Sequence, residues 1–164
     1  MSAEEKEKVF AVLNAAGIGY KAENHPAVFT VEDMINLQIS HIDKIAKNLF
    51  LRDDKKRDYY ILVMKSDKSA NLKQLRRLIG SRPLTFADEN DLNEYLGLSK
   101  GAVSPLGVLN DIGNTVTVII DNELKSFDFI GIHPNDNTAT IFISIDDLIK
   151  VIGNDGRRII FAEI

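Results

Sequence analysis

The stretch Ile45-Ala46-Lys47-Asn48-Leu49-Phe50-Leu51 has the side-chain pattern of a β-strand, with a lysine set among apolar residues. Successive side chains of a strand point to opposite faces, so Lys47 lies on one face and Asn48 on the other. Both faces are otherwise largely apolar, which predicts an interior strand covered on both sides. An ammonium group in such a place needs a partner, because burying it unpaired is costly. Two interpretations remain open: Lys47 contacts a ligand, or it extends past its apolar neighbours to water.

The composition is that of one compact domain covering residues 1–164. The chain is 45% hydrophobic and 27% charged, which is enough for a core of its own. It has no cysteine, so disulfides, thiolate metal ligands and a cysteine nucleophile are excluded. No apolar run approaches the roughly 20 residues that cross a bilayer, and the N-terminus does not have the basic and apolar character of a leader. We therefore expect a cytoplasmic protein with no membrane partner.

The charges are unevenly distributed along the chain. The formal net charge is -4, yet residues 44–82 hold 12 of the 20 Lys and Arg and only 4 of the 24 Asp and Glu, a local net charge of +8. The rest of the chain holds 8 basic against 20 acidic residues, a net charge of -12. A basic segment on an acidic body predicts one face that meets nucleic acid. The alternative is ordinary solvated helix and turn surface.

Helical and strand patterns alternate irregularly along the chain. Apolar spacing and capping residues predict helices over 2–16 and 71–79, and others that begin after Thr30, Asp88 and Ser144. Apolar runs between turn signals predict strands over 45–51, 59–64, 84–86, 116–120, 127–132, 138–143 and 158–161, with a further short strand beginning at 18–20. The sum is an α+β fold (mixed α/β): a single domain with a mixed, mostly antiparallel sheet and surrounding helices.

The spacing of polar residues excludes several familiar kinds of active site. His25 and His41 have no second ligand at metal spacing, so we expect no metal and no cofactor. No carboxylate pair or Ser-His-Asp set can be defended from the spacing. Ser104 is no nucleophile elbow, because it lacks glycines two residues before and after it.

The candidate groups that remain lie in three places. Lys47 and Asn48 lie on the strand, and His133 and Asn135 lie in a polar loop. Between these in sequence, the segment 101–107 places two glycines around a Ser-Pro pair. Glycine lets such a backbone approach a ligand closely, with amide hydrogens available as donors. The residues alone therefore predict a lysine suited to phosphate, a glycine loop and a polar loop.

Motifs in the same places resemble a known family. They are His25-Pro26-Ala27-Val28-Phe29-Thr30, Lys47-Asn48-Leu49-Phe50-Leu51, Gly101-Ala102-Val103-Ser104-Pro105-Leu106-Gly107, and His133-Pro134-Asn135 leading to Asn137-Thr138-Ala139-Thr140. In this order and spacing they resemble the YbaK-type aminoacyl-tRNA deacylase superfamily, which includes the editing domain of bacterial prolyl-tRNA synthetase (ProRS). The likeness is greatest to free-standing members of the ProXp-ala or PrdX type, and it extends over nearly the whole chain.

The resemblance implies a role for each motif. Lys47 is similar to the family lysine that lies near the terminal adenosine and its phosphate, a contact that suits a flexible point charge. Gly101 and Pro105 match the ends of a Gly-x-x-x-Pro loop whose backbone lines the aminoacyl pocket. His133, with Asn135, matches the loop that holds the acceptor end. We expect reaction-centre roles for Lys47, Gly101 and His133. The expected substrate-binding residues are Phe29, Thr30, Met34, Asn48, Ser104, Pro105, Gly107 and Asn135.

The function implied by the resemblance is hydrolysis of mischarged alanyl-tRNA(Pro), assisted by the substrate's own ribose hydroxyl. The expected partners are the tRNA acceptor end and prolyl-tRNA synthetase. Phe29, Thr30 and Met34 are the expected walls that admit alanine and exclude proline, although core packing or helix capping explains each equally well. Two alternatives remain: a deacylase for cysteinyl- or seryl-tRNA, and a non-catalytic module that binds aminoacyl-tRNA or an amino acid.

Overall fold

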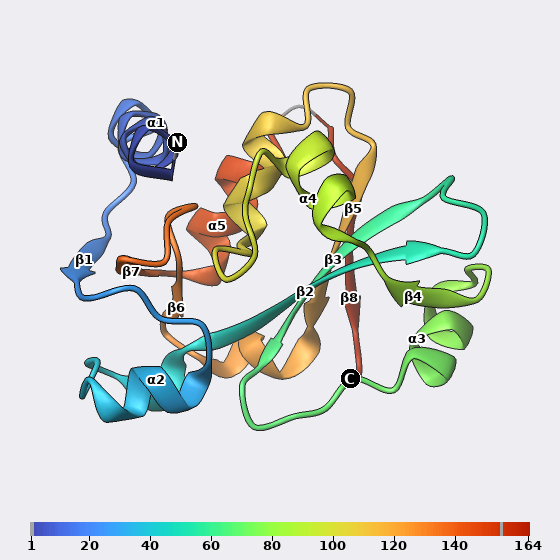
Figure 1. Cartoon of the computed structure of the whole chain (residues 1–164), viewed down its shortest axis with the longest axis horizontal. Helices are drawn as coiled ribbons and strands as arrows, with labels where there is room; N and C mark the ends of the chain where they lie inside the picture. The colour runs from blue at the N-terminus through green and yellow to red at the C-terminus, as the bar shows by residue number, and fades with distance from the viewer. Residues whose placement is uncertain (1, 155) are drawn as a thin grey trace.

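The structure, a computed structural model, describes residues 2–154 and 156–164 (Figure 1). The helices are α1 (Ser2–Ala15), α2 (Val31–Asn36), α3 (Leu72–Ile79), α4 (Glu89–Leu96) and α5 (Ile145–Ile152), with 3-10 helices η1 (Ile42–Lys44), η2 (Pro105–Asn110) and η3 (Asn122–Ser126). The strands are β1 (Lys21–Asn24), β2 (Ala46–Asp53), β3 (Tyr59–Lys65), β4 (Leu84–Phe86), β5 (Val116–Asp121), β6 (Ile130–Ile132), β7 (Ala139–Ile143) and β8 (Ile159–Ala162). The predicted α+β class is confirmed.

Helix ends follow the capping residues of the sequence. The Asp88 side chain accepts a hydrogen bond from the Asp91 amide at the start of α4, and Gly97 ends that helix in the left-handed conformation. Two strand starts differ from the prediction. Ile18 donates its amide to Leu13, which closes α1 and delays β1 to Lys21. Phe127 closes η3 in the same way, which confines β6 to its last three residues.

The strands form two sheets. The larger has the order β4-β2-β3-β5-β8, in which β2 is antiparallel to β3 and β4 whereas β5 is parallel to β3 and β8. The smaller is antiparallel, in the order β1-β7-β6. A bridge between Ile45 and Gly131 joins the two sheets where β2 begins. The mixed, mostly antiparallel arrangement is thus as predicted, but it is divided between two sheets.

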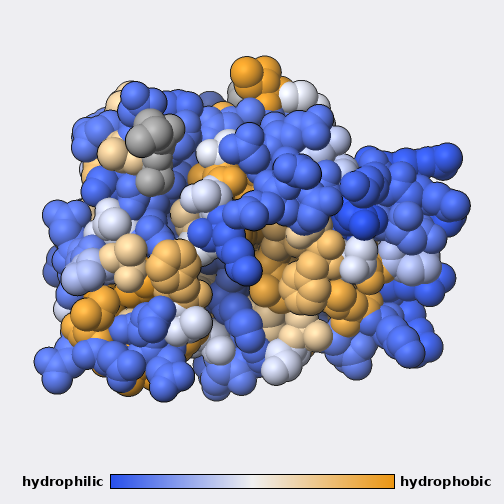
Figure 2. Space-filling model, viewed as in Figure 1, coloured by the Kyte–Doolittle hydropathy of each residue, from blue (hydrophilic) through white to orange (hydrophobic). Residues whose placement is uncertain are grey.

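One edge of β2 is only partly covered. β3 pairs with β2 over Ala46–Arg52, whereas β4 pairs with it only over Leu51–Asp53. In the described part of the chain, no strand continues that second edge between the β4 pairing and the bridge at Ile45. The carbonyl oxygen of Phe50 still accepts from the amide of Ala87 at 3.0 Å, so we call residues 46–49 the open edge. In Figure 2, hydrophobic side chains reach the surface between α4 and α3, over the larger sheet.

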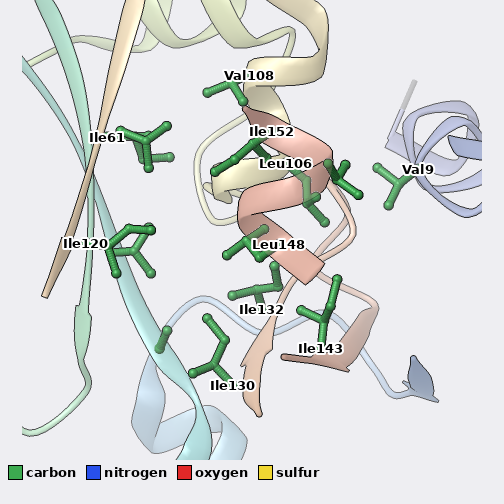
Figure 3. Packing of buried hydrophobic residues seen from close by; sticks show 14 of the residues in the cluster. Val9, Ile61, Leu106, Val108, Ile120, Ile130, Ile132, Ile143, Leu148 and Ile152 are labelled. Atoms are coloured by element: carbon green, nitrogen blue, oxygen red, sulfur yellow. The ribbon is translucent and has the colours of Figure 1, made fainter. Parts of the chain in front are cut away.

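Both faces of β2 are packed, as the alternation predicts. Ala46 and Phe50 belong to the main core cluster, and Leu51 belongs to a second cluster under α3. Figure 3 shows the main cluster, with α5 lying between the strands that carry Ile61 and Ile120 and the helix α1. None of the described helices has the length and apolar character needed to cross a membrane.

Candidate functional site

A cavity of about 480 Å³ lies at the open edge of β2, where the two sheets meet. Seven of the predicted site residues line it, and they come from four separate segments: Phe29, Thr30, Met34, Lys47, Asn48, Gly101 and His133. The structure therefore brings together residues as far apart in sequence as 29 and 133. The remaining lining residues are Val28, Val31, Ile45, Ala46, Leu49, Val103, Gly131, Ile132 and Thr140.

The ammonium group of Lys47 is held by a main-chain group. Its Nζ donates to the carbonyl oxygen of Lys68 at 3.2 Å. Lys68 is itself fixed, because its Nζ lies 2.9 Å from Oδ2 of the fully buried Asp121 and 2.6 Å from Oε2 of Glu123. Within the described residues, Lys47 forms no ion pair. An ammonium has three donor hydrogens, so Lys47 has two further donors for a ligand.

His133 is held as a neutral imidazole with a defined tautomer. Its Nδ1 lies 2.8 Å from the carbonyl oxygen of Ala139, and a carbonyl only accepts, so Nδ1 carries the proton. Burial lowers the pKa of His133, and the neighbouring His25 acts in the same direction, against the opposing bond to Ala139. Nε2 is therefore a hydrogen-bond acceptor near neutral pH.

A second histidine extends this polar wall. His25 has Nδ1 at 2.9 Å from the carbonyl oxygen of Pro26 and Nε2 at 2.9 Å from Oγ1 of Thr140. In the tautomer that donates from Nδ1 to this carbonyl, Nε2 of His25 accepts from the Thr140 hydroxyl. The rings of His25 and His133 are 6.2 Å apart. Thr140 is fully buried and lines the cavity. The bond to His25 therefore fixes the orientation of a hydroxyl in the cavity wall.

The glycine loop approaches the mouth of the cavity at Gly101. This residue has a φ of +91°, and a Cβ atom there would lie 2.7 Å from Cδ1 of Phe29. Any larger residue would therefore be strained and would displace the Phe29 ring. Phe29 is 68% exposed, so it forms a lip between the cavity and solvent.

Thr30 and Met34 have structural roles beside the cavity. The Thr30 hydroxyl accepts from the Asp33 amide at 3.0 Å, and the Asp33 carboxylate accepts from the Thr30 amide at 3.1 Å. This capping box confirms the predicted start of α2. Met34 is 4% exposed and packs in a small cluster with Val28. Each residue is thus both a cap or core residue and part of the cavity wall.

Four predicted substrate-binding residues lie behind the cavity wall. Ser104, Pro105, Gly107 and Asn135 are buried, and none of them is among the cavity-lining residues. Ser104 accepts from the amide of Leu106 at 3.2 Å, and Asn135 donates to the carbonyl oxygen of Leu106 at 3.2 Å. They hold the loop in place, and direct contact with a substrate stays a prediction for all four.

Sequence reasoning missed the cavity roles of His25, Thr140 and Gly131. The signal for Thr140 was available: a hydroxyl in an otherwise apolar strand. Gly131 gave no such signal. A Cβ there would lie 2.5 Å from Cδ1 of Ile45, so the close approach of the two sheets requires glycine.

The basic segment divides into paired and unpaired charges. Arg52 lies 3.8 Å from Asp91, and Arg82 binds Asp54 through two bonds of 2.7 and 3.1 Å. On α3, by contrast, the exposed side chains of Lys73, Arg76 and Arg77 form no ion pair with any described residue. We call these three residues the α3 basic face.

Fold and cavity together define the class: a single-domain α+β protein with a polar ligand pocket at the open edge of a central strand. A family model described as the aminoacyl-tRNA editing domain matches residues 25–151. The chain belongs to this family, as its motifs predict.

Relatives of known name support the assignment. The chain is 44% identical over 157 residues to the prolyl-tRNA editing protein ProX of Acetoanaerobium sticklandii, covering 96% of each chain. It is 34% identical to the prolyl-tRNA synthetase associated domain-containing protein 1 of Bos taurus, covering 88% of this chain and 86% of the relative. The crystal structure of a candidate trans-editing enzyme for prolyl tRNA synthetase superposes with a TM-score of 0.76 at 20% identity, over 97% and 95% of the two chains, which shows the shared fold.

Proposed function

We propose that this protein is a trans-acting editing deacylase that hydrolyses alanyl-tRNA(Pro). The observation that carries the proposal is that one cavity is lined by both the Lys47 ammonium and the neutral imidazole of His133. The 44% identity to a prolyl-tRNA editing protein supports the choice of tRNA. Ala-tRNA(Pro), as distinct from another mischarged tRNA, is the more specific part of the proposal.

The cavity suits an aminoacyl ester of adenosine. Its volume of about 480 Å³ lies in the usual range of small-molecule sites and exceeds what an alanyl group alone would fill. In our proposal Lys47 binds the phosphate of the terminal adenosine. Oδ1 of Asn48 is buried without a hydrogen-bond partner among the described residues, and an acceptor of this kind fits the α-ammonium of the substrate.

Hydrolysis in this site needs little chemistry from the protein. Water adds to the ester carbonyl carbon, the bond from that carbon to the ribose oxygen breaks, and the ribose oxygen takes up a proton. The vicinal ribose hydroxyl assists the water, and Nε2 of His133 accepts the hydrogen bond that orients this hydroxyl. Positioning of reactants in this way supplies much of a rate enhancement.

Selection between amino acids rests on the size of the aminoacyl part of the cavity. Phe29 and Met34 form its apolar walls, and the Thr30 cap fixes the start of the helix that carries Met34. A synthetase site built for proline cannot reject alanine strongly, since one methylene changes binding by only about 1 to 3 kcal/mol. A second and smaller pocket rejects proline instead.

The α3 basic face is the proposed contact for the acceptor stem. Its charges have no carboxylate partners among the described residues, so they remain available for phosphate groups. Prolyl-tRNA synthetase is the proposed source of the mischarged substrate.

Comparing hydrolysis of alanyl-, cysteinyl-, seryl- and prolyl-tRNA(Pro) tests the proposal. We expect alanyl-tRNA to be hydrolysed fastest and prolyl-tRNA to persist. Faster loss of the cysteinyl or seryl ester would assign the pocket to that amino acid. Binding of all four without hydrolysis would make the protein a binding module, and equal loss of prolyl-tRNA would contradict an editing function.

A further inference from the structure

A second cavity of about 360 Å³ adjoins the first along the open edge of β2. The two cavities share Asn48, Leu49 and Val103 as lining residues. The second one extends from these toward β4 and the beginning of α4, where Figure 2 shows hydrophobic surface over the larger sheet. A molecule that fills the first cavity and continues along the strand edge would enter the second.

The second cavity combines an apolar floor with an exposed aromatic ring. Phe50 and Leu92 are buried beneath it, whereas Phe86 is 57% exposed at its side. An exposed phenylalanine beside an apolar floor suits the flat face of a nucleobase, because bases stack on aromatic rings.

Charged side chains at the rim of the second cavity differ in the contacts that they make within the protein. Asp88 caps α4 by accepting from the Asp91 amide at 2.8 Å, and it also lies 3.6 Å from Nζ of Lys56. Glu89 and Lys100 are exposed beside it. A carboxylate is the side chain that accepts from the exocyclic amino group of cytosine, and an ammonium suits the adjoining phosphate.

We infer that this second cavity binds the nucleotide that precedes the terminal adenosine. In an acceptor end, which finishes in C-C-A, that nucleotide is a cytidine. Phe86 stacks on its base, Glu89 accepts from its amino group, and Lys100 contacts its phosphate. Asn48 and Leu49 lie at the junction of the two nucleotide positions. This inference rests on the proposed function, since it takes the first cavity as the site of the aminoacyl-adenosine.

The first test compares a long and a short substrate. Phe86→Ala is expected to lower kcat/KM for alanyl-tRNA(Pro) about 10-fold, the size of a lost stacking contact, and to leave hydrolysis of 3′-O-alanyladenosine unchanged. Phe86→Tyr keeps a stacking ring and should keep activity on both. Ile112→Ala is the control, because Ile112 is 93% exposed and lines neither cavity. Equal losses on both substrates, or no loss on either, would overturn the inference.

The second test does not depend on catalysis. Titration of the wild-type protein with cytidylyl-adenosine, uridylyl-adenosine and adenosine should show the tightest binding for the cytosine dinucleotide. Glu89→Gln should remove the preference for cytosine over uracil, and Phe86→Ala should weaken the binding of both dinucleotides while leaving that of adenosine unchanged. Equal affinity of the wild-type protein for adenosine and both dinucleotides would refute the second site. If binding behaves as expected but no aminoacyl ester is hydrolysed, the proposed reaction fails and the nucleotide site stands.

Discussion

The two ends of β2 surround a cationic side chain in different ways. At the end closed by β4, Arg52 lies 3.8 Å from the buried Asp91 and donates to the carbonyl oxygen of Asp53 at 2.8 Å. At the open edge, Lys47 has a single main-chain carbonyl as its described partner and faces a cavity. One strand thus carries one cation that is paired with a carboxylate of the fold and one that has no described carboxylate partner and is available to a ligand.

The same division applies to the rest of the basic segment. Lys68 and Arg82 pair with carboxylates, as Arg52 does, whereas the α3 basic face does not. Paired charges fix loops and strand ends, and unpaired charges leave an electrostatic field that acts on partners. A count of charges along the sequence cannot separate the two kinds, because it does not show which carboxylates approach from elsewhere in the chain.

Removing each cation of β2 in turn tests whether the two ends of the strand differ in this way. Lys47→Ala should lower kcat/KM for alanyl-tRNA(Pro) about 100-fold, because the phosphate contact that positions the ester is lost, with little change in the free energy of unfolding. Arg52→Ala should instead cost about 2 kcal/mol in the free energy of unfolding, because Asp91 loses a partner while buried. Urea denaturation and single-turnover deacylation measure the two effects. Full activity in Lys47→Ala would remove this residue from the site.

The next largest effect is expected at His133: the variant His133→Gln should lower the rate of hydrolysis about 100-fold. Burial holds the pKa of His133 below its ordinary value of about 6.5, so the ring is neutral at pH 7. We expect wild-type activity to fall only when the pH drops below 6.5, as the ring becomes protonated, and the variant to lack this acidic limb.

The stability of the fold should change with pH in the same direction as the activity. An unfolded histidine binds a proton more readily than the buried one, so the contribution of His133 to stability is lost as the pH falls below 6.5. A pH profile of kcat/KM that is identical in wild type and His133→Gln would exclude this residue as the acceptor.

Local signals were enough to predict most of the fold. Capping side chains at Thr30, Asp88 and Ser144 begin helices within a turn of where they stand, and the alternation of residues 45–51 depends only on the strand itself. The division into two sheets could not be predicted in this way. It depends on Gly131 meeting Ile45 and on β4 pairing with only three residues of β2, which are contacts between distant segments.

The candidate site shows the same limit. Lys47 and His133 could be found because a lone charge or imidazole next to apolar residues needs an explanation. Ser104 and Asn135 have equally polar side chains in their loops, yet they turn inward, because the amide and carbonyl of Leu106 need partners. Sequence alone does not tell a polar group that serves the backbone from one that serves a ligand.

The α3 basic face tests whether unpaired charges act on tRNA more than paired ones do. Replacing Lys73, Arg76 and Arg77 together by serine should weaken tRNA binding about 10-fold at low salt and flatten the plot of log affinity against log salt by up to roughly 3 units. Arg82→Ser is the matched control, because its charge is already paired with Asp54, and it should change the slope less than Arg76→Ser does. Filter-binding titrations from low to moderate salt measure both slopes. Salt-independent binding by the wild-type protein would remove the electrostatic basis of this contact.

The smallest expected effect concerns Lys68, whose carbonyl oxygen holds Lys47 while its own ammonium is anchored to Asp121. Lys68→Met frees that segment, so we expect kcat to fall about 5-fold through poorer positioning of Lys47, with KM little changed. Lys65→Met is the control, since Lys65 also pairs with Glu123 but has no bond to Lys47.

The decisive measurement for Lys68 is a double-mutant cycle. If Lys68 acts only by placing the Lys47 ammonium, adding Lys68→Met to Lys47→Ala should cause no further loss of kcat, because the group being positioned is already gone. A loss of the same size in both backgrounds would mean that Lys68 acts on the site by another route, and that a paired cation of this segment also contributes to function.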